Sequence, residues 1–304
     1  MPASPTPTVS PVTPANAVNA VNAALSSAAA TATAATVAIG RDGRGSGFVV
    51  ADGVVLTNAH TLRASTTQIR FADGRTVQGE VRSTDSDGDL IAISVDTGSV
   101  TPLSLADVAP TPGSYVIAAH GDGSVAVGHV AATGRSFPGP RGQSIGNALE
   151  HTGSLPRGAS GGPLVDVDGR LVAINTNRSD AGYQAIAVTG AVRARLDALI
   201  AGTSFHRRQL GVSLAPASTA AQIRKAAGLP EAVGLLVRGV ADDSPASRAG
   251  LLQGDVITSA DGATTETLSQ LAEALARPAD TVVLAVVRGT STIEVSVSFA
   301  DPVA

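Results

Sequence analysis

The strongest constraint on the fold is a long series of short apolar runs separated by tight-turn dipeptides, from Thr36 to about Val188. Apolar runs of this length are typical of β-strands. Asp-Gly pairs between the runs supply the positive φ angles that tight hairpin turns require. These pairs include Asp52-Gly53, Asp73-Gly74, Asp122-Gly123 and Asp168-Gly169. We therefore predict an all-β region over these residues.

Two prolines, Pro110 and Pro112, interrupt the strand pattern between Ala106 and Gly113. Proline cannot donate a backbone hydrogen bond and is excluded from central strands. This seam divides the β region into two similar halves, which fits two β-barrels side by side. Aromatic residues make up only 2% of the chain and tryptophan is absent, so the core must consist of Val, Ile, Leu and Ala, which suits sheets.

The rest of the chain carries helical as well as strand patterns. Residues 189–201 have apolar side chains at helical spacing and predict a closing helix, after which residues 202–208 are expected to form a linker. Beyond the linker, strands alternate with two helices. Ser244 is positioned to cap the first, and Thr267 and Gln270 have capping-box spacing at the start of the second. This pattern predicts an α+β module.

The N-terminal segment has a different composition. Residues 1–14 are rich in Pro, Thr, Ser and Ala, as expected for a solvated tether. Residues 18–39 predict a short docking helix that leads into a strand, because Asn19 and Asn22 make the segment too polar for a membrane span. Met1 is not followed by the segments of a secretory signal, so either the protein is cytoplasmic or the numbering begins after a removed segment.

Charge and residue usage argue against several partners and cofactors. The net charge is -4 without a long basic run, so we expect no binding to nucleic acid. The chain has no cysteine, which excludes disulfides and thiolate zinc sites. Most of the histidines are scattered, without a His-Glu-x-x-His motif, and we expect neither a metal nor another cofactor. The scattered histidines are His120, His129, His151 and His206.

The most informative stretch runs from Gly158 to Leu164, where Ser160 stands among three glycines. Such a turn lets backbone N–H groups converge without Cβ atoms in the way. Donors of this kind, aimed at a developing negative charge, contribute roughly 3 kcal/mol each to an acyl-transfer reaction. A Gly-rich hairpin turn without catalytic meaning is the alternative.

A serine nucleophile needs a base, and the base needs an orienting group. His60 directly follows an apolar run, which places an imidazole at the end of a strand. Asp89 immediately precedes another apolar strand, so its carboxylate is expected at the rim of a barrel. Asp85 and Asp87 are alternatives, and we prefer Asp89 because it alone adjoins the strand. The order His, Asp, Ser across two barrel halves makes each assignment support the others.

Together these motifs resemble the chymotrypsin-type serine peptidases, and specifically the HtrA family of PDZ-linked proteases. Residues 45–50 and 56–60 are similar to the first conserved block of that family, and residues 157–164 to its serine block. The resemblance covers roughly residues 36–300. It implies a mostly β fold, a chymotrypsin-like double six-stranded β-barrel followed by an α+β PDZ domain.

The resemblance also implies roles for the site residues. His60 would act as general base and then acid, Asp89 would orient it, and Ser160 would attack the peptide carbonyl. Gly158 and Ser160 would donate the N–H groups of the oxyanion hole, with Ala159 between them. The family usually has Asn before the serine, and we expect Ala159 to be tolerated because backbone groups bind the oxyanion.

The same resemblance points to a primary specificity pocket. Ser154 would lie at its floor, and the strand Ile174-Asn175-Thr176 would form its wall. No Asp or Glu lies in these positions. We therefore expect a preference for small or medium apolar side chains over Lys or Arg.

The last domain resembles a PDZ domain at Gln209-Leu210-Gly211-Val212, which is similar to the carboxylate-binding loop. N–H groups around Gly211 would bind a terminal carboxylate, and the strand that begins at Val212 would pair with the peptide. The helix from Leu268 would form the other wall. Further similarity lies in the core segments Ala249-Gly250-Leu251 and Gly254-Asp255-Val256-Ile257.

We accordingly expect four parts along the chain. They are a Pro/Ala/Thr-rich tether with an N-terminal helix over residues 1–33, a trypsin-like protease domain over 34–201 with its seam near 106–113, a linker over 202–208, and the PDZ domain over 209–304.

The resemblance implies an endopeptidase that degrades unfolded or damaged proteins, with a PDZ domain that binds exposed C-termini. The alternatives are a narrow-specificity processing or signalling protease, or a catalytically resting PDZ scaffold or chaperone. Family members are mostly exported or tethered to membranes, which implies an extracytoplasmic location with the anchor or signal absent from this chain. The family usually forms trimers through aromatic residues near the N-terminus. This chain has none before Phe48, so we expect a homo-oligomer without specifying a trimer.

Overall fold

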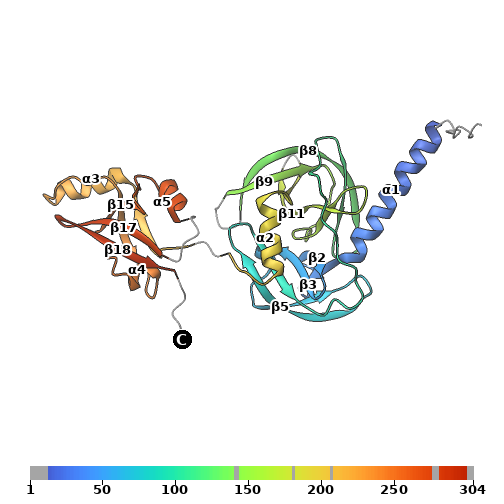
Figure 1. Cartoon of the computed structure of the whole chain (residues 1–304), viewed down its shortest axis with the longest axis horizontal. Coiled ribbons are helices and arrows are strands. Elements are labelled where there is room, and N and C mark those ends of the chain that lie inside the picture. The colour runs from blue at the N-terminus through green and yellow to red at the C-terminus, as the bar shows by residue number, and fades with distance from the viewer. Residues whose placement is uncertain (1–12, 140–143, 180–181, 206–207, 276–280, 300–304) are drawn as a thin grey trace, which may run out of the picture. The chain divides into compact units, whose positions relative to one another are not determined.

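The structure is a computed structural model that describes residues 13–139, 144–179, 182–205, 208–275 and 281–299 (Figure 1). Residues 1–12, which belong to the expected tether, lie outside the described residues. The chain divides into two compact units, residues 1–206 and 207–304. Each unit is described separately below.

Six antiparallel strands close the first barrel. Their order around it is β1-β2-β3-β6-β5-β4. They are β1 (Thr36–Ile39), β2 (Gly45–Ala51), β3 (Val54–Asn58), β4 (Thr66–Arg70), β5 (Thr76–Asp85) and β6 (Leu90–Ser94). Val, Ile and Leu side chains with Phe48, Phe71 and the alanines fill the interior.

Six further strands close the second barrel in the order β10-β11-β12-β9-β8-β7. They are β7 (Tyr115–Ala119), β8 (Val125–Pro138), β9 (Ser144–His151), β10 (Pro163–Val165), β11 (Leu171–Ser179) and β12 (Gly182–Ala187). The double six-stranded barrel predicted from the sequence is therefore confirmed. The Asp-Gly turns also form as predicted, since Gly53, Gly74, Gly123 and Gly169 all have positive φ.

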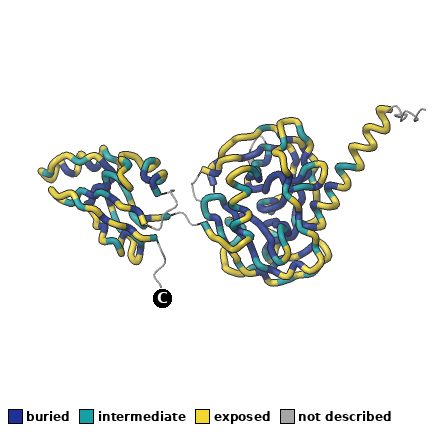
Figure 2. The backbone as a smooth tube through the Cα atoms, viewed as in Figure 1, coloured by how far each residue is buried: buried dark blue, intermediate teal, exposed yellow. Residues whose placement is uncertain are grey.

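Two helices accompany the barrels. Helix α1 (Pro14–Ala35) leads directly into β1, and its Ala28, Ala32 and Ala35 are buried against the barrel core. Its N-terminal half projects away from the barrels (Figure 1) and is exposed (Figure 2). Helix α2 (Ala191–Ile200) packs against β5 and β6. In the described part of the chain, no helix is both long and apolar enough to cross a membrane.

Part of the expected linker is bound to the first barrel. The N–H of Phe205 donates to the carbonyl of Thr84 at 2.7 Å, and the N–H of Ser86 donates to the carbonyl of Phe205 at 3.0 Å. The Ser204 hydroxyl accepts from the N–H of Thr84 at 3.1 Å. Residues 204–205 thus extend the ladder of β5 in parallel orientation.

The second unit contains one sheet with strand order β13-β14-β15-β17-β18, and β16 pairs with β15. Its strands are β13 (Val212–Ala215), β14 (Leu235–Val240), β15 (Val256–Ala260), β16 (Ala263–Thr264), β17 (Thr281–Arg288) and β18 (Ser291–Ser298). Its helices are α3 (Ala217–Ala226), α4 (Pro245–Arg248) and α5 (Leu268–Leu275). Ser244 caps α4 through the N–H of Ser247, and Thr267 and Gln270 form the predicted capping box at α5.

Candidate active site

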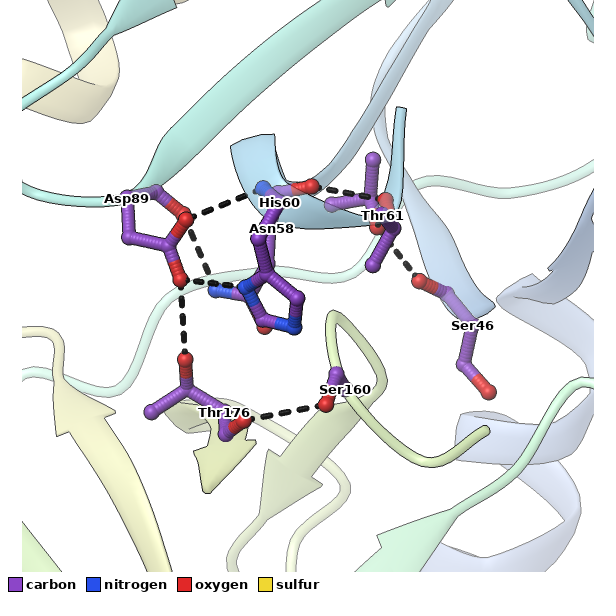
Figure 3. Close-up of polar contacts among 8 residues, drawn as sticks. Ser46, Asn58, His60, Thr61, Asp89, Ser160 and Thr176 are labelled. Atoms are coloured by element: carbon purple, nitrogen blue, oxygen red, sulfur yellow. Dashed lines mark hydrogen bonds and ion pairs between the residues drawn. The ribbon is translucent and has the colours of Figure 1, made fainter. Parts of the chain in front are cut away.

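His60 and Asp89 are brought together by two paired strands. His60 lies in a short 3-10 helix, η1 (Ala59–Thr61), directly after β3, and Asp89 directly precedes β6. Since Asn58 of β3 pairs with Leu90 of β6, the two residues emerge at the same barrel rim. His60 Nδ1 lies 2.6 Å from Asp89 Oδ2, and the His60 N–H donates to Asp89 Oδ1 at 3.0 Å (Figure 3). One carboxylate therefore fixes both the ring and the backbone of the histidine.

The backbone of Asp89 is itself held in an uncommon conformation. Its φ is 55°, a region that non-glycine residues rarely occupy. The N–H of Ala59 and the side-chain amide of Asn58 both donate to its carbonyl, at 2.9 and 3.0 Å. Thr176 of the second barrel donates its hydroxyl to Asp89 Oδ2 at 3.3 Å. These bonds stabilise the turn that aims the carboxylate at the imidazole.

Asp85, an alternative for the same role, is occupied elsewhere. It is fully buried, pairs with Arg195 at 2.9 Å and accepts from the N–H of Gly88 at 3.0 Å. Burial raises the pKa of Asp85, against the lowering effects of the Gly88 N–H and the Arg195 charge. Asp85 thus anchors helix α2 and shapes the loop that leads to Asp89.

Ser160 lies on the loop between β9 and β10, on the opposite wall of the cleft from His60 (Figure 3). Its hydroxyl donates to the carbonyl of Thr176 at 2.9 Å. Thr176 therefore contacts both halves of the site, through its hydroxyl to Asp89 and through its carbonyl to Ser160. Because a hydroxyl has one proton, it must release this carbonyl before it can donate to the imidazole.

The loop around Ser160 presents its carbonyls away from the cleft. The Ser46 hydroxyl donates to the carbonyl of Gly158 at 2.8 Å, and the Ser46 N–H donates to the carbonyl of Ser160 at 2.9 Å. The carbonyl of Ala159 accepts from Gly162 at 3.0 Å. Among the described residues, no acceptor bonds to the N–H groups of Gly158 or Ser160. These N–H groups are thus available to an oxygen of a bound substrate.

The Ala159 side chain packs into the core of the second barrel and is only 5% exposed. Its methyl group offers no hydrogen bond, so at this position the loop acts through its backbone. The departure from the asparagine that the family usually has is therefore compatible with this backbone geometry.

A cavity of about 170 Å³ adjoins Ser160. Its walls are formed by Pro156, Arg157, Gly158, Ala159, Ser160, Asn175, Thr176, Asn177, Arg178 and Tyr183. Asn175 and Thr176 were expected there. Ser154 and Ile174 are corrections, because Ser154 is exposed outside the cavity and Ile174 points into the barrel core, fully buried. Alternation along a strand sends Ile174 to the face opposite Asn175.

Tyr183 and Arg178 are cavity residues that sequence reasoning missed. Behind the wall, the buried His151 donates from Nε2 to Asn175 Oδ1 at 2.8 Å and accepts at Nδ1 from the N–H of Gly153 at 3.2 Å. Its ring stacks on Tyr183 with centroids 5.7 Å apart. Burial lowers the pKa of His151, against the raising effect of the Asn175 hydrogen bond, and both bonds fit the neutral imidazole. The alternation of residues along a strand does not predict that Tyr183 and Arg178 reach the cavity or that His151 supports its wall.

The second unit carries a larger groove, of about 610 Å³, between β13 and α5. Leu210, Gly211 and Val212 line one wall, and Leu268 and Leu271 are among the residues of the other. Gly211 has a φ of 76°, which favours glycine. The groove is mostly apolar, with the open edge of β13 along one side.

In the part of the chain that the structure describes, no group of three His, Asp or Glu residues is arranged to hold a metal ion. The side chains and backbone N–H groups already named lie together at the cleft. They supply a hydroxyl, an imidazole bound to a carboxylate, and free donors beside the hydroxyl. Serine peptidases use this combination of groups.

Comparison with known families agrees with this geometry. Residues 45–174 match the model of the trypsin-like peptidase domain, and residues 208–299 match that of the PDZ domain. The chain is thus a trypsin-like peptidase domain followed by one PDZ domain. Among curated proteins it is similar to a probable periplasmic serine endoprotease, DegP-like, of Halomonas elongata, with 29% identity over 272 residues. It is also similar to the putative serine protease HhoA of Synechocystis, with 32% identity over 242 residues.

These alignments include 84% and 72% of this chain, but 56% and 60% of the two relatives, so the chain spans little more than half their length. Among solved structures, the HtrA-type protease AlgW with decapeptide has a TM-score of 0.61 at 23% identity, covering 90% of this chain and 97% of AlgW. A serine endoprotease from Yersinia pestis has a TM-score of 0.62 at 24% identity, covering 90% and 96%. In its fold and in the order of its two domains, the chain is similar to the HtrA-type proteases.

Proposed function

We propose that this chain is a serine endopeptidase that cleaves unfolded or damaged polypeptides through an acyl-enzyme. The observation that carries the proposal is the 2.6 Å contact between His60 and Asp89 across the cleft from Ser160. A buried carboxylate bonded to Nδ1 leaves Nε2 as the basic nitrogen, on the side of the ring that faces the cleft. The relatives that are named serine proteases support the same activity.

In this mechanism the Ser160 hydroxyl leaves the Thr176 carbonyl and donates to His60 Nε2. As the oxygen attacks the substrate carbonyl, His60 takes its proton, and Asp89 stabilises the imidazolium that forms. The N–H groups of Gly158 and Ser160 bind the oxyanion. His60 then gives the proton to the departing amine, which leaves the acyl group on Ser160. Water, activated by His60, hydrolyses the ester and restores the hydroxyl.

Substrate choice follows from the cavity beside Ser160. Its volume of about 170 Å³ suits a small or medium side chain, and its walls contain Arg157 and Arg178 but no Asp or Glu, which disfavours Lys and Arg and supports an apolar side chain. Side chains of this kind become accessible when proteins unfold, which supports a role in protein quality control.

We further propose that the groove of the PDZ domain binds exposed C-termini, with backbone N–H groups near Gly211 at the carboxylate and the edge of β13 pairing with the peptide. The curated relatives named periplasmic support a site of action outside the cytoplasm. We extend to this chain the homo-oligomeric state that the family resemblance implies.

The proposal predicts degradation of an unfolded substrate by the full chain. Wild-type protein should cleave reduced, unfolded casein and leave a folded protein of similar size intact, whereas Ser160→Ala should lose at least about a thousandfold in rate. Ser154→Ala is the matched control, since this exposed serine lies outside the cavity, and it should retain wild-type activity. Cleavage by Ser160→Ala at the wild-type rate would contradict the proposal.

The hydrogen bond from Ser160 to Thr176 favours one second candidate, a protein that rests with its serine turned away and acts mainly as a PDZ scaffold. The same casein assay separates the two functions. A scaffold binds unfolded casein without producing fragments, in wild type and Ser160→Ala alike.

A further inference from the structure

The loop that bears Ser160 has four successive carbonyls held by hydrogen bonds from outside the cleft. Those of Gly158, Ala159 and Ser160 have the partners described above, two of them from Ser46 and one from Gly162. The first carbonyl, of Arg157, lies 3.2 Å from His120 Nε2. His120 thus contacts the loop directly beside Gly158, and the mechanism proposed above gives it no role.

His120 is placed for this contact by a tight turn at the end of β7. Its backbone N–H donates to the carbonyl of Ser124 at 3.0 Å, and its side chain is buried, with the residue 6% exposed. Nδ1 faces Asp122, lying 3.1 Å from the backbone N–H and 2.7 Å from Oδ1. The pKa of the Asp122 carboxyl is lowered to about 2, first by its bonds from Ser124 and then by His120.

These partners determine where the ring carries its proton. If Nδ1 accepts from the Asp122 N–H, the neutral ring has its proton on Nε2. If Nδ1 donates to the Asp122 carboxylate, the neutral ring would bring an unprotonated Nε2 against the Arg157 carbonyl oxygen, and two acceptors cannot bond to each other. With Nδ1 protonated, the contact at Nε2 therefore requires the imidazolium, in which Nε2 also carries a proton. In both cases Nε2 donates to the carbonyl of Arg157. The contact therefore persists in both protonation states of the ring.

We propose that His120 is a positioning residue for the oxyanion hole, acting through the peptide bond between Arg157 and Gly158. In a trans peptide the C=O and N–H groups point in opposite directions. Holding the carbonyl of Arg157 against His120 therefore directs the N–H of Gly158 to the other side of the loop, where it has no acceptor among the described residues. This inference rests on the proposed peptidase function, for which that N–H binds the oxyanion.

Gly158 itself cannot fix the orientation of this peptide. Its φ is 93°, and glycine populates positive and negative φ about equally, so rotation of the preceding peptide plane meets little intrinsic resistance. No other residue fits, because a Cβ at this position would lie 2.7 Å from the carbonyl oxygen of Gly43. The loop needs glycine for space, and an external donor must then hold the peptide in place. If the peptide between Arg157 and Gly158 rotated, the oxyanion site would lose the N–H of Gly158. The carbonyl oxygen of Arg157 would then point towards that site.

The test compares substitutions at His120 in the full chain. His120→Leu and His120→Phe remove the donor and keep apolar bulk, and His120→Gln keeps an N–H at a similar reach. His129→Leu is the matched control, because His129 is an exposed histidine on β8 that lies outside the site. Each variant is assayed for kcat and KM on a peptide substrate and for the rate at which a fluorophosphonate probe labels Ser160.

We expect His120→Leu and His120→Phe to lose about a hundredfold in kcat and in labelling rate, with KM changed less than about threefold, as for loss of one oxyanion donor. His120→Gln should recover at least about a tenth of the wild-type kcat, and His129→Leu should match wild type. Wild-type kcat and labelling in either apolar variant would overturn the inference. Equal losses in His120→Gln and the apolar variants would also overturn it, since a purely structural role does not depend on the N–H.

Two measurements separate this inference from the proposed function. A wild-type protein that neither cleaves peptide nor labels at Ser160 contradicts the peptidase activity. The position of the proton does not depend on activity: ¹⁵N NMR of the histidine rings should show a protonated Nε2 on His120 in the wild type. A crystal structure of either apolar variant should show the Arg157 carbonyl rotated towards the cleft. An unprotonated Nε2, or an unrotated peptide in a folded variant, overturns the role of His120 whatever the activity.

Discussion

At the scale of residues, the site pairs a buried carboxylate with an imidazole that is partly exposed. Asp89 is buried and bonded to His60, Thr176 and the backbone, while the His60 ring remains partly exposed to the cleft. Burial of the carboxylate with full hydrogen bonding avoids the large cost of an unpaired buried charge. The imidazole therefore lies between a buried carboxylate and the open cleft.

His151 supports the cavity wall in its neutral form, and this makes the stability of the wall depend on pH. Because burial lowers the pKa of His151 below its ordinary 6.5, the unfolded chain takes up a proton that the folded protein does not. The contribution of His151 to the free energy of unfolding is fully present above about pH 6.5 and is lost as the pH falls towards the folded pKa.

We expect His151→Gln, which keeps an N–H for Asn175, to lose less stability than wild type when the pH falls from about 7.5 to about 5.5. Urea unfolding can be followed by tyrosine fluorescence, because both tyrosines, Tyr115 and Tyr183, lie in the peptidase unit. His129→Gln is the control and should follow wild type. Equal pH dependence in wild type and His151→Gln would show that His151 remains protonated in the folded state.

Some residues of the site could be identified from the sequence and others could not. His60, Asp89 and Ser160 adjoin strand ends and glycine turns, and both features are visible in the chain. The role of His120 depends on a contact with residue 157, and Tyr183 reaches the cavity from β12. Such side chains meet only when the barrel closes, so neither spacing nor composition marks them. Ser154 and Ile174 lie outside the cavity, because Ser154 is exposed and Ile174 points into the barrel core.

At the scale of elements, local signals predicted the tight turns and the helices α2, α4 and α5, but not helix α3. Helix α4 begins at the Ser244 cap and α5 at the Thr267 capping box, as predicted. Helix α3 was missed. Its N-cap residue, Pro216, provides no side-chain cap. The helix is stabilised by packing, because its Ala220 is buried in a cluster with Leu236. Tertiary packing commonly decides helices of this kind.

The groove between β13 and α5 depends on the backbone of Gly211. We expect Gly211→Ala to weaken binding of a C-terminal apolar peptide by at least about tenfold, because a Cβ there would overlap the Cβ of Ser244 and shift the loop. Gly228→Ala is the matched control. Its φ of 69° imposes a similar backbone strain, but a Cβ there meets no atom within 4 Å, and Gly228 lies outside the groove.

Affinities can be measured by fluorescence anisotropy with a labelled peptide, either with a free C-terminus or amidated. Wild type and Gly228→Ala should bind the free acid about equally and the amide much more weakly. Equal affinity of Gly211→Ala and Gly228→Ala for the free acid would contradict a carboxylate site at this loop.

At the scale of the whole molecule, two compact units carry separate sites, a peptidase cleft and a peptide groove. The cleft depends on both barrels, since the first carries His60 and Asp89 and the second carries Ser160. The Thr176 hydroxyl joins the two barrels through its bond to Asp89. His60 and Asp89 precede Ser160 in the chain because the first barrel carries the histidine and the aspartate and the second barrel carries the serine. The composition allowed this fold without specifying the cleft.

We propose that His60 makes the Ser160 hydroxyl nucleophilic. The most direct measurement is to treat folded wild-type protein with a fluorophosphonate probe and map the adduct by mass spectrometry. Cleavage after Arg157 and Arg170 releases a peptide of residues 158–170 in which Ser160 is the only hydroxyl side chain. The adduct should appear on this peptide in wild type, be absent in Ser160→Ala, and form at least about a thousandfold more slowly in His60→Ala. An adduct on another peptide, or labelling of Ser160 at the same rate without His60, would contradict the account.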